Sequence, residues 1–420
     1  AVAAAIRSAS AAAVVAARPG GTSGGPSGWP VSATTPLRAQ SAAGSAGNSP
    51  APDARPGDMR RRYADPTMAT PSPGADRIAP AELPGRCAEQ LLDAGGGLVD
   101  PLVVVDLDAP AQPADLAAAA AAAARTDRIV VGVATGALRR STAALVAALD
   151  VTIVPDGAAG RELVCADDPG AEADVLRAAV ESDPGAATVL AGLLRWSASL
   201  PVPAALDAES LAYSTLLGGP EFRRWLHRRG PRPLPPPARA EPVLLARRGD
   251  QLCITLNRPE RRNAYGRELR GALVEALELA ELDPSIAVVV LDGAGPAFCA
   301  GGDLDEFGTT PDLVTAHLVR TRGGAALAMH RLAGRTEARL HGACVGAGIE
   351  LPAFAGRVVA APDTTLRLPE VGMGLIPGAG GTVSIPARIG RWRTLHLALT
   401  GRALPASTAL AWGLVDEIAG

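Results

Sequence analysis

Two glycine-rich turns, each close to a glutamate, constrain the fold of this chain more than any other feature. The turns span residues 346–348 and 378–381, and Glu350 and Glu370 stand near them in otherwise apolar surroundings. Glycine accepts positive φ and has no Cβ, so such turns can present backbone N–H groups to a ligand. A carboxylate held behind such a turn, in a dry pocket, is typical of acid–base chemistry.

The overall composition narrows the classes of function. A chain of 420 residues with 48% hydrophobic residues can bury the cores of two or more domains. All 40 basic residues are Arg, so a Schiff-base lysine and a phosphate-loop lysine are both excluded. A net charge of −3 favours neither nucleic acid nor an anionic membrane as a partner. No apolar run approaches the length that spans a membrane.

The five cysteines are widely separated and form no CxxC pair. This spacing predicts neither a metal site nor a disulfide framework, and it fits a reducing, cytoplasmic compartment. Cys253, Cys299 and Cys344 lie in apolar segments, where we expect them to be packing residues.

Residues 1–85 are rich in Ala, Gly, Ser and Pro, and their first acidic residue is Asp53. Three interpretations remain open: a transit peptide, a disordered tail, or sequence upstream of a start near Met59 or Met68. We favour a disordered tail because residues 22–61 show no periodicity.

Residues 86–229 are predicted to form an α/β unit followed by helices. Apolar strands at 101–107, 128–134 and 151–154 alternate with helical segments, which indicates a parallel sheet. Residues 171–229 are predicted to be helical. The basic run at 223–229 is interpreted either as a solvated helix face or as an anion contact, such as one to a phosphate.

A proline-rich linker at 230–242 marks the clearest domain boundary, and residues 243–420 form the second unit. Here the pattern predicts a hairpin, a central parallel strand at 286–291 and a buried strand at 338–345. Further helices are predicted at 266–281, 314–332, 390–400 and 405–413.

Five motifs occur in order in this second unit: LNRPERRNA, VVVLDGAGPAFCAGGDL, HGACVGAGIEL, LPEVGMGLIPGAGGT and LTGRALPASTALAWGLVDEI. With them, residues 243–420 closely resemble the crotonase (enoyl-CoA hydratase/isomerase) superfamily. The resemblance implies an α/β fold, a crotonase-like spiral of ββα units. It also implies an acyl-CoA thioester as substrate and no metal or cofactor, coenzyme A being part of the substrate.

The resemblance assigns roles to individual positions. The N–H groups of Gly302 and Ala347 would form the oxyanion hole that stabilises an enolate. Glu350 would activate a water molecule, Glu370 would supply a proton to Cα, and the Gly378 N–H would place the water. For Glu350 alone, a cap or dipole partner in the first turn of a helix is the better explanation, but the two glutamates together with both donors favour catalysis.

Substrate-binding positions also follow from the resemblance. Coenzyme A would run mostly along backbone at Arg262, Ala264, Ala300, Gly301, Asp303, Leu304, Asp305 and Gly346. Either Arg261 or Arg262 would meet a phosphate, or both are solvated surface arginines.

Three departures from the family pattern stand out. Ala347 occupies a position where glycine is common, so a positive φ there would be strained. Pro352 follows Glu350 closely and is tolerated only in or near a first helical turn. The sequence stops where the family continues with a helical module. We therefore hypothesise that residues 86–229 are a degenerate crotonase-like copy whose helices cap the second unit.

These observations favour an enoyl-CoA hydratase that adds water in the syn sense, with a role in fatty acid metabolism and β-oxidation. The alternatives are a Δ3,Δ2-enoyl-CoA isomerase or another enolate-forming member, and a non-catalytic acyl-CoA-binding subunit. A homo-oligomer, trimer or hexamer, is expected from the family.

Overall fold

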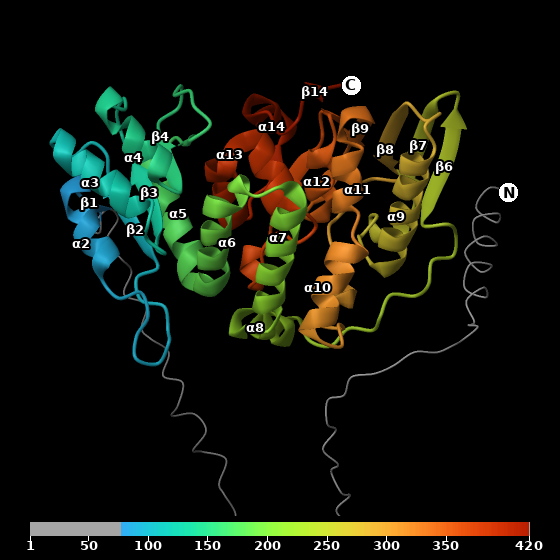
Figure 1. Ribbon diagram of the computed structural model, residues 1–420, viewed down its shortest axis with the longest axis horizontal. Helices are drawn as coiled ribbons and strands as arrows, with labels where there is room; N and C mark the ends of the chain where they lie inside the picture. Colours follow the sequence, from blue (N-terminus) through green and yellow to red (C-terminus); the bar gives the residue numbers. More distant parts are fainter. Residues whose placement is uncertain (1–76, 420) are drawn as a thin grey trace, which may run out of the picture. The chain divides into compact units, whose positions relative to one another are not determined.

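The computed structural model describes residues 77–419 (Figure 1). The expectation of a tail or transit peptide therefore falls mainly on residues outside the described part of the chain. Within the described residues, the first element is β1 (Arg77–Ile78), which lies several residues before the boundary expected after residue 85.

The first sheet is entirely parallel, and its strands follow the order β1-β2-β3-β4-β5. Three of its strands match the predicted ones: β2 (Leu102–Asp106), β3 (Ile129–Val133) and β4 (Val151–Val154). The last is β5 (Leu163–Cys165), and the helices of this region are α2 (Leu83–Ala88), α3 (Pro113–Ala123) and α4 (Ala143–Ala148). Its strands are near-continuous apolar runs because both faces of the sheet are buried.

Alternate residues of this sheet belong to two different cores. Val103 and Val105 face a small core shared with α3 and α4. Leu102 and Val104 belong to a large core that continues into the second unit. Helix α13 (Gly381–Thr400) contacts both β4 and β5, so the two regions share buried apolar surface.

Four helices follow, as the sequence predicts: α5 (Pro169–Ser182), α6 (Pro184–Trp196), α7 (Val202–Leu217) and α8 (Pro220–Arg229). The Glu221 carboxylate on α8 accepts N–H groups at the start of α6, from Gly185 at 2.7 Å and Ala186 at 2.9 Å. This buried cap places a negative charge at a helix N-terminus, where it is stabilising. Residues 230–242 contain no helix or strand.

The second unit contains a six-stranded sheet in the order β14-β11-β9-β8-β7-β6. The predicted hairpin is confirmed as the antiparallel pair β6 (Val243–Arg248) and β7 (Gln251–Leu256). The predicted central strand is confirmed as β8 (Val288–Gly293), which is parallel to both neighbours. The other strands are β9 (Thr336–Leu340), β11 (Arg357–Ala360) and β14 (Glu417–Ile418).

The second unit also contains a three-stranded sheet in the order β10-β12-β13. Its strands are β10 (Ala343–Val345), β12 (Thr365–Arg367) and β13 (Leu404–Pro405). The helices of this unit are α9 (Arg267–Leu282), α10 (Leu313–Arg322), α11 (Ala326–Arg331), α12 (Ala347–Glu350), α13 and α14 (Ala406–Trp412). The mixed α/β fold with parallel sheets that the sequence predicts is confirmed.

Three predicted elements were wrong in detail. The expected single strand at 338–345 is two strands in different sheets, because Gly342 turns the chain at a φ of 53°. A Cβ there would lie 2.2 Å from the Pro296 carbonyl oxygen. The expected helix at 314–332 is interrupted around Gly323 and Gly324, giving α10 and α11. Helix α13 starts earlier than predicted and is kinked at Gly390.

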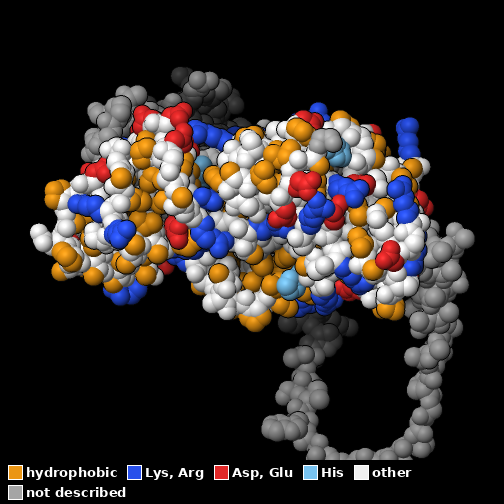
Figure 2. Space-filling view, turned by 90° about the horizontal axis from the view of Figure 1, so that it is seen from above, with side chains coloured by type: hydrophobic (Ala, Val, Ile, Leu, Met, Phe, Trp, Pro, Cys, Tyr) orange, Lys and Arg blue, Asp and Glu red, His pale blue; other side chains and the backbone are white. Residues whose placement is uncertain are grey.

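Helix α7 covers the second unit. It contacts α10, α11 and α13, while α8 contacts the short helix Val371–Met373. Among the helices of residues 77–419, none combines the length and apolar character needed to cross a membrane. In Figure 2, acidic and basic side chains are interspersed over the face that is visible.

Candidate functional site

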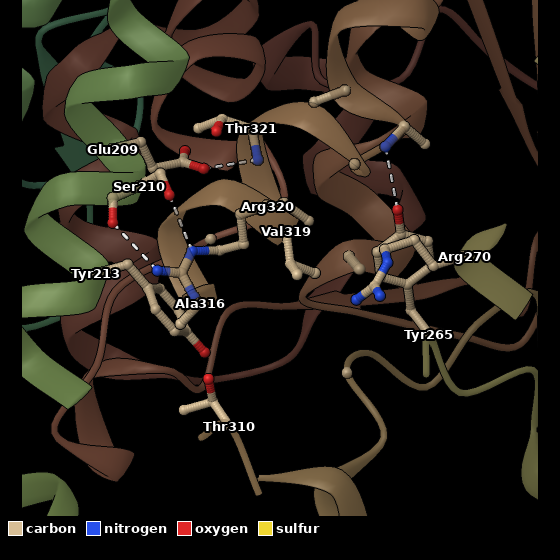
Figure 3. A pocket seen from close by; sticks show the side chains of 18 of the residues that line it. Glu209, Ser210, Tyr213, Tyr265, Arg270, Thr310, Ala316, Val319, Arg320 and Thr321 are labelled. Carbon is tan, nitrogen blue, oxygen red and sulfur yellow. Dashed lines mark hydrogen bonds between the residues drawn. The ribbon is translucent and has the colours of Figure 1, made fainter. Parts of the chain in front are cut away.

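A cavity of about 350 Å³ lies under α7 and brings five expected residues together. Its walls include the residues predicted as donors, carboxylates and water-positioning group: Gly302, Ala347, Glu350, Glu370 and Gly378. Further walls come from α7, α9, α10, the segment 306–311 and residues 324–327, and Figure 3 labels several of these residues.

Two backbone hydrogen bonds bring the donor segments side by side. The Cys299 N–H donates to the Ala343 carbonyl at 3.3 Å, and the Val345 N–H donates to the Cys299 carbonyl at 3.0 Å. The chain after Cys299 therefore runs beside the chain after β10. A Cβ on Gly348 would lie 2.2 Å from the Cys299 oxygen, so only glycine allows this approach.

The N–H groups of Gly302 and Ala347 both border this cavity. Neither donates a hydrogen bond to an acceptor in the part of the chain that the structure describes. For Ala347 this follows from its place as the first residue of α12, because first-turn N–H groups have no partner within their helix. Both residues thus line one cavity with backbone N–H groups that are available to a ligand, and their role as an oxyanion hole stays a prediction.

The strain expected at Ala347 is absent. The positive φ of the turn, 50°, falls on Gly346, and Ala347 has helical geometry. Pro352 opens a separate short 3₁₀-helix, Pro352–Phe354, where its missing N–H is not needed.

Glu350 is 2% exposed, and its Oε2 accepts two backbone hydrogen bonds, from Ala379 at 2.7 Å and Gly381 at 2.9 Å. Its Oε1 accepts no hydrogen bond from the described residues. Burial, followed by repulsion from the Glu370 and Glu209 carboxylates, raises the pKa of Glu350 well above its ordinary value.

Glu370 is 8% exposed, and its Oε2 has no hydrogen-bond partner within residues 77–419. Burial raises the pKa of Glu370 to about 8. Glycine at 346 is required by this side chain, since a Cβ there would lie 2.4 Å from the Glu370 Oε1 and 3.6 Å from the Glu350 Oε1. Both carboxyl groups therefore lie against the same turn.

The two carboxyl groups have different hydrogen-bond environments. Amide donors stabilise the charged form of Glu350, whereas Glu370 has no comparable donor at Oε2. Burial raises the pKa of both groups, so the site can hold a carboxyl proton near neutral pH beside a second glutamate.

Three side chains of the site were missed from the sequence: Glu209, Tyr213 and Arg320. Glu209 on α7 accepts hydrogen bonds from the Gly380 N–H at 2.8 Å and from the Thr382 N–H at 2.9 Å. Tyr213 on α7 packs against Gly378, where a Cβ would lie 2.4 Å from the ring. In the sequence, the only indication of these side chains is the charged residue Glu209 within an apolar helix, and this pattern does not predict its hydrogen-bond partners.

A second cavity of about 620 Å³ shares Gly302, Phe307 and Glu370 with the first. Four arginines line it: Arg228, Arg229, Arg232 and Arg367. The basic end of α8 thus borders a cavity that touches the donor turn, in keeping with the anion-contact interpretation of that run.

The expected coenzyme A positions are distributed between the cavities. Ala300, Gly301 and Leu304 line the second cavity, and Asp303 lines the first. The other four positions line neither: Arg262, Ala264, Asp305 and Gly346.

Arg261, expected either to meet a phosphate or to be solvated, is held by carboxylates. It binds Asp303 at 2.6 Å and Asp305 at 2.9 Å. Its guanidinium is therefore engaged within the protein.

The fold and the site together define an α/β protein with a cavity that is bordered by two buried glutamates and two glycine-rich turns. Residues 250–420 match the family model described as enoyl-CoA hydratase/isomerase. The chain belongs to this enoyl-CoA hydratase/isomerase, or crotonase, family, as the resemblance predicted.

The relatives that the chain matches are named for different reactions. The chain is 35% identical over 172 residues to the 1,2-epoxyphenylacetyl-CoA isomerase of Escherichia coli, which covers 40% of this chain and 65% of the relative. It is 34% identical over 176 residues to the 2,3-dehydroadipyl-CoA hydratase of Escherichia coli, covering 42% of this chain and 68% of the relative. A mevalonyl-coenzyme A hydratase of Beauveria bassiana is 35% identical, covering 40% of this chain and 62% of that protein. The chain thus spans less than two thirds of the length of the first and third of these relatives.

Among solved structures, an enoyl-CoA hydratase of Thermoplasma volcanium matches with 34% identity and a TM-score of 0.38. The match covers 43% of this chain and 72% of that one.

Proposed function

We propose that the protein is an enoyl-CoA hydratase, a hydro-lyase that adds water across the 2,3 double bond of an acyl-CoA thioester. One observation carries the proposal: two available N–H donors and two buried carboxyl groups border a single cavity. Hydration needs all four groups at once, two to stabilise the enolate and two to handle the water and the proton.

The thioester carbonyl oxygen would lie between the N–H groups of Gly302 and Ala347. Negative charge develops on this oxygen when the nucleophile adds to Cβ. Fixed backbone dipoles stabilise that charge without reorganising, and each such donor is worth roughly 10²- to 10³-fold in rate.

Glu350 would act as the base that activates water, through the oxygen that the amides of residues 379 and 381 leave free. Glu370 would donate its proton to Cα. Because both carboxyl groups lie against the turn at Gly346, water and proton would arrive from the same side, which is syn addition. The Gly378 N–H, at the cavity wall, would help to position the water.

The coenzyme A moiety would extend through the second cavity, since that cavity begins at Gly302 and Glu370. Its phosphates would contact the four arginines there, because guanidinium groups match phosphate oxygens in geometry and charge. All of these steps use only the protein, the thioester and one water molecule.

A specific observation supports an isomerase as the second candidate. Glu350 is anchored by two amides at Oε2, whereas Glu370 Oε2 is buried and has no hydrogen-bond partner among the described residues. A Δ3,Δ2-enoyl-CoA isomerase needs a single carboxyl group to move a proton between carbons.

The deciding experiment follows the ultraviolet absorbance of the conjugated thioester across acyl chain lengths. Glu350→Gln and Glu370→Gln should each lower the rate of hydration by roughly 10²- to 10⁴-fold. Glu278→Gln, an exposed substitution on α9, is the matched control and should be neutral.

Other outcomes identify the alternatives. Isomerase activity that tolerates Glu350→Gln but not Glu370→Gln would establish the second candidate. Tight acyl-CoA binding without turnover of any enoyl-CoA would indicate a non-catalytic subunit. From the family alone we also expect a homo-oligomer, trimer or hexamer, in the cytoplasm, and light scattering measures the assembly.

A further inference from the structure

Arg320, on α10, is a largely buried cation without an ion pair. Its Nε donates to the Ser210 Oγ at 3.1 Å, and its Nη2 donates to the Ser210 carbonyl at 3.2 Å and to the Ser214 Oγ. All of these acceptors are neutral, and within residues 77–419 no carboxylate lies at ion-pair distance. Its Nη1 has no acceptor in the same part of the chain.

The Arg320 guanidinium lines the same cavity as the two catalytic candidates. It lies over the Tyr213 ring, 4.4 Å from the ring centroid, and that ring packs against Gly378. Figure 3 shows Ala316 and Val319 near the guanidinium, and the Tyr213 hydroxyl pointing toward Thr310. The cavity therefore combines apolar side chains with the Arg320 cation, and three further arginines line it: Arg267, Arg270 and Arg322.

The carboxyl group of Glu209 does not compensate the positive charge of Arg320 through an ion pair. Glu209 interacts with it electrostatically, but both Glu209 oxygens accept hydrogen bonds from the start of α13. Burial raises the pKa of Glu209 to about 7, so its negative charge is only partial near neutrality. Arg270, from α9, lines the same cavity and also has no ion pair with a described carboxylate.

A buried charge is costly unless an opposite charge and hydrogen bonds satisfy it. The Nε and Nη2 of Arg320 already donate to Ser210 and Ser214, so among the described residues Nη1 is the free end of this guanidinium. A carboxylate forms strong, charge-assisted hydrogen bonds to such a group. We infer that the cavity accepts acyl-CoA thioesters whose acyl group ends in a carboxylate, and that Arg320 binds this carboxylate. The inference rests on the proposed function in one respect, that the acyl group enters this cavity.

Calorimetric titration with saturated thioesters tests the inference without any turnover, because they have no double bond to hydrate. Three pairs of equal chain length are compared: succinyl- with butyryl-CoA, glutaryl- with pentanoyl-CoA, and adipyl- with hexanoyl-CoA. For at least one pair, the wild-type protein should bind the carboxylate-bearing thioester about 10- to 100-fold more tightly. Equal or weaker binding of the acid in all three pairs overturns the inference.

Arg320→Met retains a long side chain without charge and should bring the ratio of affinities in the preferred pair to about 1. Arg331→Met is the matched control, because Arg331 is on α11, is 59% exposed and does not line the cavity. It should leave the ratio unchanged. A preference that survives Arg320→Met contradicts the assignment to Arg320.

Arg320 also ties α10 to α7, so the methionine variant is checked by its binding of the uncharged thioester. Should that binding be lost, Arg320→Lys supplies the test: it keeps the positive charge and should retain a reduced preference. Complete loss of the preference in the lysine variant, with the uncharged thioester still bound, contradicts recognition by this charge. Failure of hydration with a retained preference would refute only the hydratase, and the reverse result would refute only the carboxylate subsite.

Discussion

Glu209 and Glu350 accept hydrogen bonds from alternate amides of the same turn. Glu350 binds the N–H groups of residues 379 and 381, and Glu209 binds those of residues 380 and 382. The two side chains come from helices far apart in the sequence, α12 and α7. The start of α13 is thereby fixed between two carboxyl groups, one of which is the proposed base.

Replacing Glu209 should change the chemistry of the site as well as its stability. The Glu209 charge raises the pKa of both Glu350 and Glu370, so Glu209→Gln should lower both. The alkaline limb of the hydration profile, where Glu370 loses its proton, should then move to lower pH. The measurement is kcat/KM against pH for the wild type and the variant.

Glu221→Gln provides the control for that experiment, because Glu221 caps α6 in the same way but lines neither cavity. Both variants should lose roughly 1–2 kcal/mol of unfolding free energy. Only Glu209→Gln should move the pH profile. If the profile is the same in both variants, Glu209 acts only as a structural cap.

The donor at Ala347 can be removed by proline. Because Ala347 is the first residue of α12, proline there suits a helix start while eliminating the N–H. Ala347→Pro should lower kcat/KM by about 10²- to 10³-fold. Ala347→Gly retains the N–H and should stay close to wild type, and equal losses in the two variants would count against the oxyanion hole.

Stability should fall as the pH rises from the ordinary carboxyl pKa toward that of Glu370. Between pH 4.5 and about 8 the native state keeps a proton that the unfolded state releases. The free energy of unfolding therefore decreases with pH in this window. The glutamine of Glu370→Gln cannot ionise. The free energy of unfolding of this variant, minus that of the wild type, should therefore be roughly 1–3 kcal/mol larger at pH 8 than at pH 4.5.

Urea unfolding of both proteins at the two pH values measures this difference. Glu278→Gln, at an exposed position, should show no such dependence. A difference between Glu370→Gln and wild type that is the same at both pH values would argue against the raised pKa.

The first sheet should be thermodynamically coupled to the second unit through Asp150. This carboxylate is 1% exposed and accepts hydrogen bonds from the Val130 N–H, Arg195 on α6 and Arg391 on α13. Asp150→Asn leaves two arginines without their counter-ion and should cost roughly 3–5 kcal/mol. Urea unfolding of the full chain gives this value, with the exposed Asp174→Asn as control.

The wild-type chain should unfold in one transition under the same conditions, because the large core spans both regions. Two separate transitions, with only the first shifted by Asp150→Asn, would show that the coupling is weak. Whether residues 86–229 descend from a crotonase-like copy stays a hypothesis.

Local sequence was sufficient for much of the fold. Strands β2, β3 and β4 were predictable because an apolar run bounded by turn residues has few alternatives. The predicted strand at 338–345 failed because Gly342 permits a reversal that hydrophobicity does not register. The predicted helix at 314–332 failed for a similar reason at Gly323 and Gly324.

By itself, the sequence determined the turns and glutamates of the site, because those features lie within short stretches whose spacing sets their geometry. The donor turn, Glu350 and Glu370 follow one another along the chain, and their glycines are required where backbone and carboxylates approach closely. Only the tertiary structure determined which side chains of distant helices line the cavity. Glu209 and Tyr213 lie on α7, and Arg320 lies on α10. Because these helices are far from the turns in the sequence, no local pattern predicts which groups their side chains contact.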